Sequence, residues 1–222
     1  MKKPTRVEAR DYLQMTKERP GDTRREEGCF AHLLSAIPAP VSGKILETFG
    51  GIGLFRSVAE SLGLFGPETE HECWDFSADC VAHLRAKFPG SVVCHVDSFA
   101  ESVPPGLVLL SADFNTWTFL KYQREEAYKK MTDRLFDAEP EWLQLTDSAV
   151  NKLHLNYRSY AKALGLKDAE LVRDPEGYIQ SVAYSFADRG YGLRAAAYHN
   201  GAAYYLFQRD AEPGPVHVLR VR

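Results

Sequence analysis

The stretch that most constrains this chain is Lys44–Arg56, which reads KILETFGGIGLFR. Before the glycines, apolar residues flank a single acid, Glu47, as in a short buried strand. After them, apolar residues recur with helical period at Leu54 and Val58. A strand, a glycine turn and a helix make the first half of a βαβ unit, where ligands often bind because glycine permits positive φ and close backbone approach. The first free N–H groups of the helix would then face the ligand.

Two common nucleotide-binding motifs are missing from this turn. A dinucleotide-binding turn, G-x-G-x-x-G, needs a third glycine where this chain has Arg56. The P-loop pattern, G-x-x-x-x-G-K-[ST], occurs nowhere in the sequence. The pattern that remains, E-x-F-x-G-x-G from Glu47 to Gly53, resembles motif I of the class I S-adenosylmethionine-dependent methyltransferases. The resemblance implies a Rossmann-like α/β fold, S-adenosyl-L-methionine as the cofactor, and no metal.

The order of the predicted elements agrees with that fold. Class I methyltransferases close their sheet with an antiparallel seventh strand that pairs with the sixth, and the Asn200-Gly201 pair is a strong hairpin signal near the end of this chain. We therefore expect a seven-stranded, mostly parallel sheet with an antiparallel C-terminal hairpin strand and helices on both faces. The expected helices are 26–37, 54–62, 77–88 and 175–190, and the expected strands are 44–49, 71–75, 91–96, 106–112, 141–146, 193–198 and 202–207.

Length and composition indicate an ordinary globular protein. At 222 residues we expect a single domain, with residues 1–25 as a loosely ordered extension. The net charge of -3 gives no strong overall field toward nucleic acid or membrane. Four irregularly spaced cysteines indicate reduced, buried thiols. We find no signal-peptide pattern and no apolar run long enough to span a bilayer, so we predict a cytoplasmic protein without membrane contact. The sequence does not indicate an oligomeric state.

The resemblance also predicts residues that bind the cofactor. Asp75, at the tip of the second expected strand, would accept hydrogen bonds from both ribose hydroxyls, and Trp74 would stack on the adenine. The plainer interpretation is a helix-capping acid beside a core tryptophan. An alternative alignment, to cytosine-5 methyltransferases, requires an acid where this chain has Cys73. Asp97 matches the acid that commonly meets the adenine amino group. The full expected cofactor set is Glu47, Phe49, Gly50, Gly51, Gly53, Trp74, Asp75, Asp97 and Ser98.

The methyl acceptor is expected at the tip of the fourth strand. Methyltransferases that act on the amino groups of adenine or cytosine carry [DNS]-P-P-[YFW] there, and this chain carries Asp113, Asn115 and Trp117 without either proline. Cytosine-5 methylation needs a Pro-Cys nucleophile, and no cysteine follows Cys94. We predict that Asp113, Asn115 and Trp117 are the catalytic residues. The plainer interpretation is that Trp117 packs beneath a charged helix at 121–136, which Asn115 caps.

Three functions fit these features. The favoured one is methylation of a nucleic-acid base nitrogen, with phosphate contacts from a basic stripe of His154, Arg158 and Lys162. This stripe would lie on a long helix that begins at Asp147 or Ser148, although a solvated helix face is the commoner meaning of such a pattern. The second function is methylation of a small molecule, which fits the acidic charge balance. The third is a non-catalytic, cofactor-binding partner protein with a degraded acceptor motif.

Overall fold

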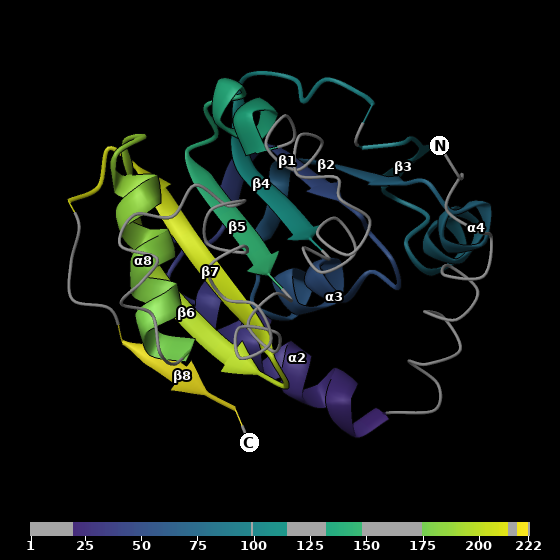
Figure 1. Ribbon diagram of the computed structural model, residues 1–222. Helices are drawn as coiled ribbons and strands as arrows, with labels where there is room; N and C mark the ends of the chain where they lie inside the picture. The colour runs from purple at the N-terminus through teal and green to yellow at the C-terminus, as the bar shows by residue number, and fades with distance from the viewer. Residues whose placement is uncertain (1–19, 99, 115–131, 148–174, 213–216, 222) are drawn as a thin grey trace, which may run out of the picture.

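The structure, a computed structural model, describes residues 20–98, 100–114, 132–147, 175–212 and 217–221. Figure 1 shows a single twisted sheet with helices on both of its faces. The helices are α2 (Pro20–Leu34), α3 (Leu54–Ser61), α4 (Ala78–Lys87) and α8 (Pro175–Ala187), and the strands are β1 (Val41–Thr48), β2 (Phe65–Asp75), β3 (Val92–His95), β4 (Leu107–Phe114), β5 (Trp142–Asp147), β6 (Tyr191–His199), β7 (Ala202–Arg209) and β8 (Val218–Arg220).

The strands form one sheet in the order β3-β2-β1-β4-β5-β7-β6-β8. Strands β3, β2, β1, β4 and β5 run parallel, and β7 lies between β5 and β6 and is antiparallel to both. This arrangement confirms the expected Rossmann-like sheet with its antiparallel C-terminal hairpin strand. The described sheet has eight strands rather than seven, because the short strand β8 pairs in parallel with β6.

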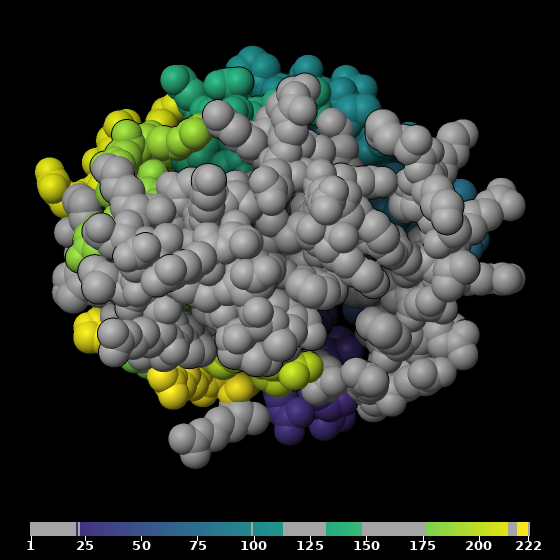
Figure 2. Space-filling model, in the orientation of Figure 1, coloured from purple at the N-terminus to yellow at the C-terminus, as the bar shows by residue number. Residues whose placement is uncertain are grey.

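Two apolar clusters hold the helices on opposite faces of the sheet. Helices α2 and α3 cover one face, where the Phe30 ring meets Phe55 and Tyr204 edge to face at centroid distances of 6.3 and 5.6 Å. Helix α8 covers the other face, where Tyr178 and Ile179 are fully buried against the inner strands. In the space-filling view, α2 forms part of the lower rim of the molecule (Figure 2).

Two elements, α2 and β2, begin six residues earlier than the sequence predicts. Helix α2 starts at Pro20, so residues 20–25 belong to a helix and not to the loosely ordered extension. Strand β2 starts at Phe65, although Gly66-Pro67 resembles a turn. Its first residues are held by the hydroxyl of Thr69, which donates to the Val41 carbonyl and accepts from the Gly66 N–H. The Thr69 side chain thus replaces the regular backbone hydrogen bonds between β1 and β2 at the point where their register is interrupted.

Some expectations fall partly or wholly outside the described residues. Residues 132–137 are helical, in agreement with the end of the helix predicted at 121–136. The helix predicted from Asp147 or Ser148 to Gly165, like the extension at 1–19, lies outside the described part. Within the part of the chain that the structure describes, no helix is long and apolar enough to cross a membrane.

Candidate cofactor site

The glycine turn lies at the carboxyl edge of the sheet, where β1 and β2 end side by side. The backbone N–H of Gly50 donates to the carbonyl of Trp74 at 3.0 Å, which ties the turn to the end of β2. The N–H of Gly53 donates to the carbonyl of Gly50 at 2.7 Å and closes the turn on itself. In open α/β sheets, ligands bind outside this edge.

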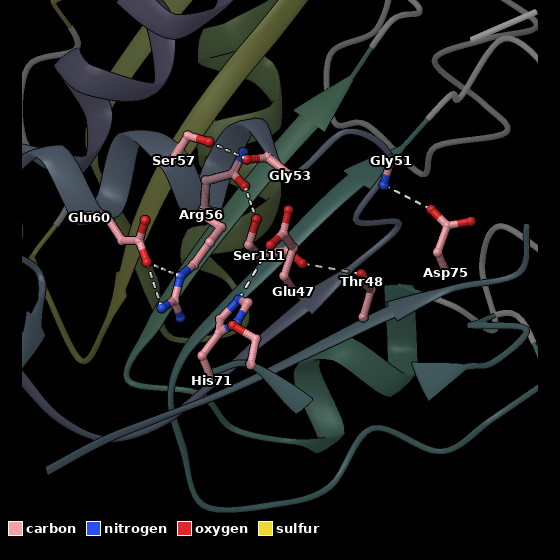
Figure 3. Close-up of polar contacts among 12 residues, drawn as sticks. Glu47, Thr48, Gly51, Gly53, Arg56, Ser57, Glu60, His71, Asp75 and Ser111 are labelled. Atoms are coloured by element: carbon pink, nitrogen blue, oxygen red, sulfur yellow. Dashed lines mark hydrogen bonds and ion pairs between the residues drawn. The ribbon is translucent and has the colours of Figure 1, made fainter. Parts of the chain in front are cut away.

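Asp75 joins the glycine turn to the loop that follows β2. One carboxylate oxygen accepts from the Gly51 N–H at 2.8 Å (Figure 3), and the other accepts from the Ser77 N–H at 2.7 Å. Burial raises the pKa of the Asp75 carboxyl, although these two N–H bonds act to lower it. Each oxygen has a second lone pair, so ligand hydroxyls can still donate to the carboxylate.

A serine, rather than Asp75, caps the helix that follows β2. Ser77 is the N-cap of α4, and its hydroxyl accepts from the Cys80 N–H at 3.3 Å. Asp75 therefore lies two residues before the capping position, at the tip of β2. Its partners are the glycine turn and the Ser77 N–H, rather than the first turn of α4.

The turn contains several left-handed backbone positions. Gly51 and Gly53 have φ of 52° and 70°, and Phe49 has φ of 62°. Such a conformation costs a non-glycine residue about 1–2 kcal/mol. The half-buried Phe49 ring packs against the apolar cluster on the α8 face of the sheet. Strain of this kind persists where the surroundings fix the backbone, and it is common at ligand sites.

Two of the glycines are required by packing within the protein. A Cβ at Gly50 would lie 2.2 Å from Cys73 Sγ, and a Cβ at Gly53 would lie 2.3 Å from Phe88 Cε2. The turn thus sits directly on α4 and β2. This close approach explains both glycines without reference to a ligand.

Helix α3 starts directly after the turn, and no side chain caps its amino end. Its N-cap is Gly53, which makes no side-chain capping bond, and its first turn contains no acid. The amino end of a helix carries partial positive charge and free N–H groups, which favour a bound carboxylate. S-adenosylmethionine has one carboxylate and two ribose hydroxyls, so the α3 amino end and the Asp75 carboxylate fit its two polar ends.

The two aromatic residues that flank Asp75 differ in exposure. Trp74 is 5% exposed, and its ring N–H donates to Glu72 at 2.5 Å on the α8 face. Phe76 is 50% exposed at the tip of the strand. Sequence reasoning overlooked Phe76, although strand alternation alone places Trp74 on the opposite face from Asp75. Phe76 is the flanking aromatic with more surface for a ligand to pack against.

A buried contact between an acid and an imidazole lies below the glycine turn. Glu47 of β1 and His71 of β2 are both buried, with 3.3 Å between Glu47 Oε2 and His71 Nε2 (Figure 3). The other ring nitrogen of His71 lies 3.1 Å from the Ser91 hydroxyl. Burial, and then the neighbouring Glu47, raise the pKa of the Cys73 thiol. Cys73 is thus a neutral thiol at the position where the cytosine-5 alignment requires an acid.

The loop after β3 contributes a further pair of expected residues. Asp97 is exposed, and its backbone carbonyl accepts from the N–H groups of Ala100 and Glu101 at 2.9 and 3.0 Å. The Ser98 hydroxyl is buried and has no hydrogen-bond partner among the described residues. The backbone N–H of Val96 donates to the Asp75 carbonyl at 3.0 Å, so this loop continues from the strand beside Asp75.

The expected acceptor residues are only partly described. Asp113 is the penultimate residue of β4, opposite Thr146 of β5, and its side chain lies outside the description. Asn115 and Trp117 lie outside the described residues, as does the basic stripe of His154, Arg158 and Lys162. Asp147, which the sequence suggested as a helix cap, is the last residue of β5 and accepts a hydrogen bond from the Tyr178 hydroxyl of α8.

Comparisons with models of known protein families and with curated protein sequences give no match. Solved structures do match, and the plantazolicin methyltransferase BpumL, solved with S-adenosylhomocysteine, has a TM-score of 0.55 and 10% identity over 92% of this chain and 91% of its own. A TehB-like SAM-dependent methyltransferase from Corynebacterium glutamicum has a TM-score of 0.53 and 10% identity over 92% of this chain and all of its own.

A third match is an O-methyltransferase from neocarzinostatin biosynthesis, solved with S-adenosylmethionine and 2-hydroxy-5-methyl naphthoic acid. It has a TM-score of 0.53 and 11% identity over 90% of this chain and 58% of its own. At such low identity, the likeness establishes the fold alone. The strand order, the antiparallel β7 and these neighbours together show that the chain has the Rossmann-like fold of the class I S-adenosylmethionine-dependent methyltransferases.

Proposed function

We propose that the protein is an S-adenosylmethionine-dependent methyltransferase that acts on a nitrogen of a nucleic-acid base. The observation that carries the proposal is the contact of the Asp75 carboxylate with the glycine turn, beside the uncapped amino end of α3. These groups form one polar surface at the carboxyl edge of a methyltransferase-like sheet. Its chemistry suits a ligand with a carboxylate at one end and a ribose at the other.

Each part of the surface has a separate task. The first turn of α3 holds the ligand carboxylate, Asp75 accepts from the ribose hydroxyls, and Phe76 covers one side of the adenine. Asp97 and Ser98 lie on the adjoining loop, where they would meet the edge of the base. When bound, the cofactor supplies a methyl group activated by a sulfonium. The protein mainly contributes alignment of that methyl group with the acceptor.

The acceptor assignment rests on the sequence after β4. Asn115 supplies an amide that can hold an amino group, and Trp117 supplies an indole on which a planar base can stack. The basic stripe of His154, Arg158 and Lys162 would contact phosphates.

A small-molecule acceptor is the second candidate. The neocarzinostatin enzyme, which matches 90% of this chain, was solved in complex with S-adenosylmethionine and a naphthoic acid. The net charge of -3 also gives this chain no general attraction for nucleic acid.

Transfer of a labelled methyl group tests the proposal. The protein is incubated with methyl-labelled S-adenosylmethionine and, separately, with DNA, with RNA and with the small-molecule fraction of a cell extract. We expect label in a nucleic acid and, after nuclease digestion, in one N-methylated nucleoside. Label confined to the small-molecule fraction would favour the second candidate. Cofactor binding without label in any fraction would indicate a non-catalytic binding protein.

Asn115→Ala and Trp117→Ala test the acceptor site. We expect both variants to keep their melting temperature and cofactor affinity, while turnover falls about a hundredfold, or about 2.7 kcal/mol of transition-state stabilisation. Unchanged turnover in a stable Asn115→Ala protein would remove that residue from the site. A loss of melting temperature in Trp117→Ala that accounts for its lost activity would assign the indole to packing.

A further inference from the structure

We propose that Asp147 and Tyr178 form the acceptor-recognition pair, in which the Asp147 carboxylate accepts from an N–H group of the methyl acceptor and Tyr178 holds that carboxylate in position. The inference rests on the proposed function and extends it to strand β5 and helix α8. It also narrows the acceptor to a planar molecule with an N–H donor, such as the amino group of a base.

The strand register places Asp147 across the site from the glycine turn. Thr48, the last residue of β1, lies opposite Ala112 of β4, and Phe114 lies two residues further along β4. Phe114 in turn lies opposite Asp147 of β5. Neighbouring strands are about 4.8 Å apart, so the end of β5 lies about 10 Å from the line of β1, on the far side of β4. A ligand anchored at the turn and extended across β4 reaches the end of β5.

The burial of Asp147 argues against an incidental surface acid. Its side chain is 6% exposed, and Tyr178 is fully buried. A buried carboxylate is costly unless hydrogen bonds compensate for the lost water. The Tyr178 hydroxyl donates one such bond, and because a phenol is neutral, it orients the carboxylate without cancelling its charge. A carboxylate offers about four lone-pair sites and can accept from several donors at once.

One partly exposed aromatic residue, Tyr198, lies on the same face of the sheet as Asp147. Tyr178 and Tyr205 belong to the apolar cluster under α8, and the half-buried Tyr198 packs against that cluster. Tyr198 and Asp147 both lie opposite Ala203 of β7, one on each side of that strand. Helix α8, which carries Tyr178, lies over this end of the sheet (Figure 1). An acid beside aromatic rings suits a flat, hydrogen-donating group better than a carbonyl or a phosphate.

The test compares three variants with the wild-type protein. Asp147→Asn keeps the size of the side chain but removes its charge and half of its acceptor capacity. Tyr178→Phe removes the hydroxyl that orients Asp147. Asp137→Asn changes an exposed acid away from the sheet edge and serves as the control. The measurements are the rate of methyl transfer to the fraction that the wild-type protein labels, the dissociation constant of S-adenosylhomocysteine by calorimetry, and the melting temperature.

If the pair recognises the acceptor, Asp147→Asn lowers kcat/KM about tenfold to a hundredfold, the effect of one lost charge-assisted hydrogen bond. Tyr178→Phe raises the acceptor KM more than it lowers kcat, because it loosens a residue that binds the acceptor. Both variants keep the affinity for S-adenosylhomocysteine. Asp147→Asn keeps the wild-type melting temperature, whereas Tyr178→Phe lowers it, because the buried carboxylate loses a hydrogen bond. Asp137→Asn behaves as wild type in all three measurements.

Two outcomes overturn the inference. One is wild-type kcat/KM in Asp147→Asn, and the other is a fall in activity that follows a matching loss of melting temperature and cofactor affinity in both variants. The second outcome would mean that the pair only fastens α8 to β5. A wild-type protein that binds no S-adenosylhomocysteine or labels no fraction overturns the proposed function itself. An active wild type with an equally active Asp147→Asn variant overturns the inference alone.

Discussion

The left-handed backbone of Phe49 is the clearest single-residue cost in the site. Its φ of 62° penalises every side chain with a Cβ, whereas glycine adopts it freely. Replacement by glycine or by alanine removes the same ring, so the two variants differ mainly in backbone strain. We expect Phe49→Gly to be the more stable variant: its free energy of unfolding, measured by urea denaturation, should exceed that of Phe49→Ala by about 1 kcal/mol. An alanine variant as stable as the glycine variant would show that the backbone at Phe49 is not strained.

The raised pKa of Asp75 predicts a pH-dependent stability. Burial is the main cause of the shift, so the folded protein binds this proton more tightly than the unfolded chain does. The stabilising contribution is then complete below the unfolded pKa of about 3.9 and is lost as the pH rises through the folded pKa. Asp75→Asn removes this titration. We expect the wild-type free energy of unfolding to fall relative to that of the variant as the pH rises from about 4.

Urea denaturation of both proteins across this pH range checks the sign. A wild-type advantage that grows with pH would mean that the N–H bonds from Gly51 and Ser77 outweigh burial. In that case the carboxyl would have a lowered pKa, and the ionised form would be the stabilising one.

At the scale of elements, α2 is part of the core although the sequence suggested that its first turns belong to a loose extension. Phe30 fastens this helix between Phe55 of α3 and Tyr204 of β7. We expect Phe30→Ala to lower the free energy of unfolding by about 3–5 kcal/mol, the usual cost of a buried ring. Glu27→Ala, on an exposed position of the same helix, should change it by less than about 0.5 kcal/mol. Equal effects in urea denaturation would place α2 outside the core.

The sequence predicts an element well where its own apolar pattern is strong. Strand β4 is apolar along nearly its whole length, and the β6–β7 hairpin carries Asn200-Gly201, with φ of 45° and 81° in the structure. Elements held by distant partners are missed. The start of β2 contains Gly66 and Pro67, which oppose strand formation, and depends on the side chain of Thr69. Strand β8 is only three residues long, which is too short to show a strand pattern in the sequence. It is recognised as a strand because it pairs with β6.

The same distinction applies to the site. The glycine turn and Asp75 were predictable because their residues lie within one short βαβ pattern, and the structure brings them into contact. The contact between Asp147 and Tyr178 was not predictable, because the two residues are far apart in the sequence and meet only when α8 packs on β5. The packing role of Gly53 was hidden for the same reason, since the ring that it accommodates, Phe88, lies at the end of α4.

For the molecule as a whole, the sheet order explains why these groups meet at one edge. Because β1 lies between β2 and β4, the glycine turn has Asp75 on one side and the end of β4 on the other. Because β5 follows β4, Asp147 completes the same edge. The proposed cofactor site and Asp147 therefore lie on neighbouring parallel strands, whose carboxyl ends open on the crevice where ligands of such sheets bind.

The central claim is that this edge binds S-adenosylmethionine, and calorimetric titration with S-adenosylhomocysteine tests it most directly. We predict saturable, one-to-one binding to the wild-type protein. Asp75→Ala, measured at a temperature where circular dichroism shows it folded, should bind more weakly by about 1–3 kcal/mol. Asp79→Ala, which removes an exposed acid from the first turn of α4, should bind as the wild type does. No saturable heat with the wild-type protein, or equal affinity in Asp75→Ala, would contradict the claim.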